Sequence, residues 1–139
     1  MDKIILASKS KVRKEILNVN GINCDVFPSN VDEESVKISL IKEDASPETI
    51  SKNLAELKAN KVSAKFSDKL VIGADSVIDL EGKIISKPTN RTEALEILKL
   101  LNGKPHYLIS SVCISKGGNM IWNYTAVSYT HLTLPTKFV

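Results

Sequence analysis

The 139-residue sequence is poor in the residues that usually mark redox, disulfide or zinc sites, since it has only 2 cysteines and 2 histidines. Cys24 and Cys113 form no C-x-x-C pair and have no histidine at ligand spacing. We therefore expect two reduced thiols and neither a disulfide scaffold nor a zinc site. His106 and His131 lie far apart, with no serine or cysteine motif beside them, so we assign neither to catalysis.

The sequence also lacks runs of like charge and long apolar runs. Its 19 basic and 16 acidic residues give a formal net charge of +3 and are spread along the chain, which indicates neither a nucleic-acid partner nor an anionic membrane surface. The apolar residues 4–6 are too few for a signal peptide or a membrane span. With 42% hydrophobic residues, the chain fits one globular domain, and we expect a cytoplasmic protein.

What is present is an alternation of strand and helix patterns. Short apolar segments predict strands at residues 3–7, 23–27, 70–74, 106–115 and 119–127 and a hairpin that joins 77–80 to 83–85. Helix patterns follow a cap at Ser8 or Ser10, the start signal Ser46-Pro47-Glu48, and Pro88. The first helix carries an apolar stripe of Val12, Ile16, Leu17 and Val19, and the third ends at Gly103, a left-handed cap. Residues 31–34 open a more polar segment of less regular pattern. This interleaving predicts a mixed α/β fold with hairpins in its sheet.

Asp75 is the first candidate for chemistry, because it follows an apolar run that we interpret as a buried strand ending at Ala74. Gly73 allows another backbone or a ligand to come close, and ligands bind at strand ends in α/β sheets. An aspartate also commonly bonds the backbone of a turn, here the one entering Val77. The segment alone does not decide between these interpretations.

The segment from Ala7 to Lys11 is a candidate phosphate-binding turn. It joins a predicted strand to a predicted helix, so backbone N–H groups, hydroxyls, cationic side chains and the positive helix end meet there. No G-x-x-x-x-G-K-[ST] loop is present. Arg13, in the first turn of the helix, either forks onto phosphate oxygens or points into water, and a solvated capped helix start would also explain the whole pattern.

Three other candidates each have a simpler explanation. Asp32, Glu33 and Glu34 form an acidic cluster. One of these residues could join Asp75 in binding a hard cation such as Mg²⁺. The cluster could equally be a solvated helix start. Lys87 precedes a proline, which favours an extended backbone that could reach a site. Lys58 borders the apolar stripe of its helix, where it could line a cleft or lie exposed.

These segments together resemble the Maf family, in family order and spacing over about residues 3–127. The segments that carry the resemblance are 4–17, with Ala7-Ser8-Lys9-Ser10, then 31–33, 54–59, Gly73-Ala74-Asp75-Ser76 in 71–77, Ile85-Ser86-Lys87-Pro88, and 101–106. The resemblance implies a fold similar to that of inosine triphosphate pyrophosphatases, with a twisted mixed sheet, flanking helices and a cleft between two lobes. It also implies hydrolysis of nucleoside triphosphates to the monophosphate and pyrophosphate with a divalent metal, Mg²⁺ or Mn²⁺, and a homodimer.

The resemblance also assigns roles to residues. Asp75 occupies the position of the catalytic acid/base that activates water. Glu33, with Asp75, falls where carboxylates support the metal or water. The substrate-binding positions are Ser8, Arg13, Lys58, Ser76 and Lys87. Maf proteins also have a history as inhibitors of septum formation, so a regulator of cell division that binds nucleotides without hydrolysing them is the alternative.

The chain departs from the family pattern in ways that bear on nucleotide choice and on completeness. Ser10-Lys11-Val12-Arg13 stands where the family commonly has Ser-Pro-Arg-Arg, and Ser76 stands where a threonine often follows the catalytic aspartate. Residues 128–139 have neither a helical nor a sustained strand period and resemble a string found at the ends of unrelated environmental reading frames. We expect a domain at 1–127, a non-native tail at 128–139, and no counterpart of the family's last helix, lysine and Tyr-x-x-Gln-Gly-type segment. Such a truncated form would be weakly active or inactive.

Overall fold

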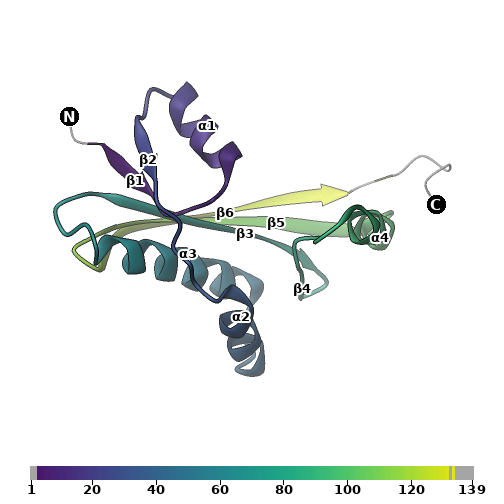
Figure 1. The fold of residues 1–139 in the computed structure, drawn as a ribbon. Coiled ribbons are helices and arrows are strands. Elements are labelled where there is room, and N and C mark those ends of the chain that lie inside the picture. Colours follow the sequence, from purple (N-terminus) through teal and green to yellow (C-terminus); the bar gives the residue numbers. More distant parts are fainter. Residues whose placement is uncertain (1–2, 132, 134–139) are drawn as a thin grey trace.

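The computed structural model describes residues 3–131 and 133 and has the expected mixed α/β fold (Figure 1). One six-stranded sheet has the order β2-β1-β3-β5-β6, and β4 pairs with β3 outside this path. In chain order the elements are β1 (Ile4–Leu6), α1 (Lys11–Val19), β2 (Cys24–Val26), α2 (Glu33–Lys42), α3 (Pro47–Ser63), β3 (Val71–Leu80), β4 (Lys83–Ile85), α4 (Arg91–Leu101), β5 (Pro105–Lys116) and β6 (Asn119–His131).

β3 does not end at Asp75, so the predicted end of this strand at Ala74 is wrong. It runs on to Leu80 and includes the first arm of the predicted hairpin. The physical reason is that β5 pairs antiparallel with β3 along this whole stretch and places Ser111 opposite Asp75. On the other edge, β1 pairs with β3 as far as Ile72 and β4 pairs from Ile78. Asp75 therefore lies in a gap between two neighbouring strands, which leaves its surroundings open to a site.

α3 follows one face of the sheet and forms as its start signal predicts (Figure 1). Ser46 caps it by accepting a hydrogen bond from the Thr49 backbone nitrogen at 3.1 Å. The helix lies very close to β3 at Gly73, where an added Cβ would be 2.7 Å from the Ala59 backbone nitrogen. The close approach expected at Gly73 is thus confirmed, and the partner is the backbone of α3.

α2 is a helix that the sequence analysis left open, as one of two explanations of the acidic cluster at residues 32–34. Asp32 caps it, with its side chain accepting a hydrogen bond from the Ser35 backbone nitrogen at 3.2 Å. No residue of α2 is buried, so the apolar periodicity that reveals most helices is weak here. The acidic segment is therefore the start of this helix, and its side chains are not all solvated, since Glu33 is half-buried.

α1 begins after Ser10, as expected, but its apolar stripe is not buried. Val12, Ile16 and Val19 are 64%, 54% and 83% exposed. α1 lies on the side of the sheet opposite α3 (Figure 1), and its apolar side chains border an open groove with residues of β3 and β5. Among the described residues nothing fills this groove, so the stripe faces solvent.

The late elements form near their predicted positions. α4 is followed by Gly103 with a φ of +72°, the left-handed conformation expected there. β6 pairs with β5 and continues to His131, opposite Pro105, so regular structure extends past residue 127, where we expected it to end. The origin of residues 128–139 stays a prediction, and residues 132 and 134–139 lie outside the described part of the chain. No helix in the described part is long and apolar enough to span a membrane.

Candidate active site

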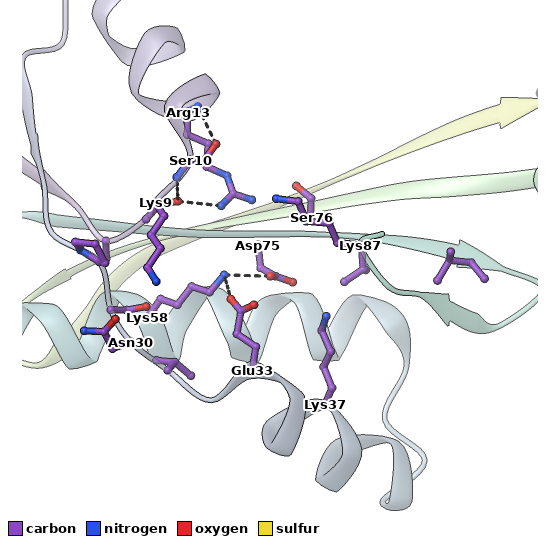
Figure 2. Close-up of a pocket in the computed structure, with 17 residues that line it drawn as sticks. Lys9, Ser10, Arg13, Asn30, Glu33, Lys37, Lys58, Asp75, Ser76 and Lys87 are labelled. Atoms are coloured by element: carbon purple, nitrogen blue, oxygen red, sulfur yellow. Dashed lines mark hydrogen bonds and ion pairs between the residues drawn. The ribbon is translucent and has the colours of Figure 1, made fainter. Parts of the chain in front are cut away.

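All seven residues proposed from the sequence line a single cavity of about 370 Å³ (Figure 2). They come from five parts of the fold: the β1–α1 turn and α1, the first turn of α2, α3, the middle of β3, and the segment after β4. In that order they are Ser8 and Arg13, Glu33, Lys58, Asp75 and Ser76, and Lys87. Residues that are dispersed over the sequence thus share one site.

The β1–α1 turn forms one wall of this cavity through a small hydrogen-bond network. The buried Ser8 hydroxyl oxygen accepts hydrogen bonds from the Ser10 backbone nitrogen at 3.1 Å and from Arg13 Nη1 at 3.3 Å. Ser10 caps α1 by accepting from the Arg13 backbone nitrogen at 3.2 Å. The guanidinium is therefore held beside the turn and the positive end of α1, which are the groups that bind phosphate at helix starts.

Lys58 joins the two carboxylates of the site. Its Nζ lies 3.2 Å from Asp75 Oδ1 and donates a second hydrogen bond to the Ala74 carbonyl oxygen, also at 3.2 Å. It also forms an ion pair with Glu33 Oε1. The Lys58 and Asp75 side chains are each only 9% exposed. Because an ammonium has three donors, Lys58 is fully used by these three oxygens and acts here as the bridge between the acids.

The Asp75 carboxylate is held in place but is not fully hydrogen-bonded. Ser51 Oγ donates to the Asp75 backbone oxygen at 3.1 Å, while Oδ2 is buried and has no hydrogen-bond partner among the described residues. Burial raises the pKa of Asp75, and the charge and hydrogen bond of Lys58 oppose this only in part. A buried carboxylate oxygen with a free lone pair and a raised pKa suits a group that accepts a proton.

Glu33 differs from Asp75 in its ionisation. Burial acts to raise its pKa, but the hydrogen bond and charge of Lys58, with the charges of Lys37 and Arg13, outweigh burial and lower the pKa below its usual value. Glu33 therefore remains a carboxylate beside Asp75. The two acids have different environments, and each is suited to a different role.

The donor set fits a hard divalent cation that takes most of its ligands from elsewhere. The described residues include no group of three or more His, Cys, Asp or Glu side chains that could hold a metal alone. They do offer Glu33 and the unpartnered buried Oδ2 of Asp75. Mg²⁺ is commonly bound by one or two carboxylates together with substrate phosphates and water, which this arrangement allows.

The remaining two predicted residues are less constrained. Ser76 Oγ lies 3.0 Å from Ser110 Oγ of β5, and Lys87 is exposed at the rim of the cavity. The sequence analysis missed Lys37, which also lines the cavity, and it included Lys9 only as a member of the candidate phosphate-binding turn. Lys37 lies four residues after Glu33 in a segment that Asp32 caps. In a helix, this spacing places the two side chains on the same face, which is the sequence pattern that could have identified Lys37.

Comparison with known proteins agrees with this architecture. The structure of the Staphylococcus aureus Ham1 protein is similar with a TM-score of 0.62 at 15% identity, covering 95% of this chain and 72% of that one. A HAM1 protein from Coxiella burnetii is similar with a TM-score of 0.50 at 14% identity, covering 93% and 71%. At these identities the likeness confirms the fold alone.

Sequence relatives are much closer. The chain is 72% identical over 123 residues to the nucleoside triphosphate pyrophosphatase of Pelagibacter ubique, covering 88% of this chain and 63% of the relative. It is 42% identical over 122 residues to the 7-methyl-GTP pyrophosphatase of Bartonella quintana, covering 87% and 60%. The chain thus spans about three fifths of the length of these curated relatives. Residues 3–136 match the sequence model described as Maf-like protein, so the chain belongs to the Maf family.

Proposed function

We propose that this chain is a nucleoside triphosphate pyrophosphatase, which hydrolyses its substrate to the monophosphate and pyrophosphate in the cavity around Asp75. The observation that carries the proposal is the meeting of Asp75, Glu33 and Lys58 with the β1–α1 turn around this one cavity. The names of the relatives in Pelagibacter ubique and Bartonella quintana support the same reaction class.

The charge of the cavity favours a triphosphate. Its lining includes two carboxylates and five cations, which are Lys9, Arg13, Lys37, Lys58 and Lys87. Since Lys58 is engaged with the acids, four cations remain to bind phosphate oxygens. In the proposed complex the Ser8 hydroxyl, the start of α1 and Arg13 bind the phosphate chain on one side, and Lys87 binds it at the rim.

Asp75 is the proposed general base. Its free Oδ2 accepts a proton from a water molecule as that water attacks the α-phosphorus, and the bond from phosphorus to the bridging oxygen breaks to release pyrophosphate. Lys58 holds the carboxylate by its other oxygen, so that Oδ2 keeps its direction. Removing a positioned general base typically costs about 10²- to 10⁴-fold in rate.

We also propose that Glu33 and Asp75 hold a divalent cation, Mg²⁺ or Mn²⁺, together with the phosphates. When bound, the cation would neutralise charge on the phosphate oxygens. Glu33 suits this role because it stays ionised, and Asp75 suits it as the second carboxylate that lines the same cavity. Further predictions are a homodimer and a cytoplasmic location, which light scattering and cell fractionation would check.

The test is pyrophosphate release from a panel of nucleoside triphosphates, with Mg²⁺ or Mn²⁺, by the wild-type chain and by Asp75→Asn. Asp68→Asn is the matched control, because Asp68 is exposed in the loop before β3. We expect release by the wild type and the control and a loss of about 10²-fold or more in Asp75→Asn. Nucleotide binding by the wild type without release would instead favour the non-hydrolysing regulator.

A further inference from the structure

Lys37 lies on the face of α2 that is turned toward the site. The half-buried residues of this helix are Glu33, Val36, Lys37 and Leu40, and its other residues are exposed. Their spacing of three and four residues defines one helix face. A lysine on such an inner face needs an explanation, because lysine side chains are ordinarily on the solvent face of a surface helix.

The Lys37 ammonium is a positive charge without a bound partner in the cavity. Lys37 lines the cavity, and Figure 2 shows its side chain rising from α2 beside Glu33. Among the residues that the structure describes, the Lys37 ammonium makes no hydrogen bond or ion pair, whereas Lys58 is bound to three oxygens. Its charge reaches both carboxylates: it contributes to the lowered pKa of Glu33, and it opposes in small part the burial that raises the pKa of Asp75. Lys37 is thus close to the reacting region without being neutralised there.

The ordinary explanation would be a helix-stabilising pair between Glu33 and Lys37, four residues apart. The structure does not favour it, because the Glu33 carboxylate is directed at Lys58 of α3 instead. No ion pair joins Glu33 to Lys37 among the described residues. The ammonium is therefore free to bind an anion that enters the cavity.

We propose that Lys37 is a substrate-binding residue whose ammonium binds the phosphate chain from the α2 side of the cavity. The β1–α1 turn with Arg13 lies on the other side of β3 in the same view (Figure 2), so the phosphates would be held between two positive walls. This inference rests on the proposed function, since it takes the ligand to be a triphosphate. It adds a contact from α2 to those of the seven residues proposed from the sequence.

The test is the binding of inorganic tripolyphosphate to the full 139-residue chain, measured by calorimetry at fixed salt. Lys37→Met removes the charge, Lys37→Arg keeps it, and Lys42→Met is the control from the exposed last turn of the same helix. We expect Lys37→Met to weaken binding about 10- to 100-fold, as for the loss of a hydrogen bond between charged groups. Lys37→Arg should restore most of it, and Lys42→Met should change it less than about 2-fold.

Tripolyphosphate has no base or sugar, so the readout reports the phosphate contact itself. Unchanged binding in Lys37→Met, or an equal loss in Lys42→Met, would overturn the proposal. Denaturation of each variant separates a folding defect from a binding defect, and Lys37→Gln serves if Lys37→Met does not fold. Failure of the proposed function would look different, since the chain would then bind tripolyphosphate in a Lys37-dependent way but release no pyrophosphate from nucleotides. A wild-type chain that binds no tripolyphosphate would overturn both.

Discussion

Replacing Lys58 by methionine should destabilise the protein in a strongly pH-dependent way. The substitution keeps most of the side-chain volume but removes the ammonium that lies 3.2 Å from Asp75 Oδ1 and pairs with Glu33. Asp75 then keeps two oxygens in a site where its side chain is only 9% exposed, with neither of them paired to a cation. The variant therefore isolates the cost of an unpaired buried carboxylate.

The expected loss in the free energy of unfolding depends on how buried Asp75 and Glu33 are. Removing one member of a buried ion pair typically costs about 3–5 kcal/mol, because the other charge is left uncompensated. Glu33 contributes little to this cost, since its side chain is 41% exposed and can be solvated. We therefore expect Lys58→Met to lower the free energy of unfolding by about 3 kcal/mol near pH 8. This is a large share of the roughly 5–15 kcal/mol by which a typical domain is stable.

The pH dependence has a definite sign. Burial already raises the pKa of Asp75 above 3.8, and removing Lys58 deletes the two interactions that lower it most. A carboxyl whose pKa is raised on folding favours the folded state below its unfolded pKa, and that stability is lost as the pH rises through the folded pKa. The difference in the free energy of unfolding between the wild type and Lys58→Met should thus be small near pH 4 and grow toward pH 8.

The assay is urea denaturation of the wild type, Lys58→Met and the double variant Lys58→Met/Asp75→Asn at several pH values. Lys52→Met is the control, because Lys52 is an exposed residue of the same helix. The double variant should recover much of the loss at pH 8, since it removes the unpaired charge. A loss below about 1 kcal/mol at pH 8, or no recovery in the double variant, would refute the role given to Lys58.

Four other predictions concern packing, capping, a thiol and the rate profile. Gly73→Ala should cost about 1–3 kcal/mol in thermal denaturation, because its Cβ would lie 2.7 Å from the Ala59 backbone nitrogen; an unchanged midpoint would contradict the close approach of α3. Ser46→Ala should lower the free energy of unfolding, measured by urea denaturation, by about 1 kcal/mol because the α3 cap is lost, and it should leave pyrophosphate release unaffected. Cys113 is fully buried, and its pKa is raised to about 11, mainly by burial and further by the charge of Glu56. A thiol reagent at pH 8 should therefore label Cys113 only as the protein unfolds, and rapid labelling of the native state would count against this. Because burial raises the pKa of Asp75, the rate of pyrophosphate release should fall with decreasing pH through a midpoint above 3.8, and a midpoint at or below 3.8 would argue against Asp75 as the base.

Local signals predicted the parts of the site that neighbouring residues determine. Ser10 and Ser46 identified the starts of α1 and α3, because a cap and its first turn are contiguous in sequence. The residue patterns also made Asp75, Arg13, Glu33, Lys58 and Lys87 candidates, each with a simpler alternative. The resemblance to the Maf family gave these residues their predicted roles and added Ser76. The bridge from Glu33 through Lys58 to Asp75 could not be read locally, because it joins three separate elements.

The errors have physical causes of the same kind. β3 continues through Asp75 because β5, far along the chain, supplies its hydrogen-bond partners, and no local pattern contains that information. α2 was left open because none of its residues is buried, so Lys37 was missed with it. The exposure of the α1 stripe depends on what covers the groove beside Ile16, which is again a tertiary property.

The central claim is that Asp75 activates water for attack on a triphosphate held in this cavity. Its most direct test is the rate of pyrophosphate release by Asp75→Asn relative to the wild type, with tripolyphosphate binding measured on the same samples. The account predicts a rate lower by about 10²- to 10⁴-fold with binding retained. Turnover by Asp75→Asn equal to that of the wild type would contradict it.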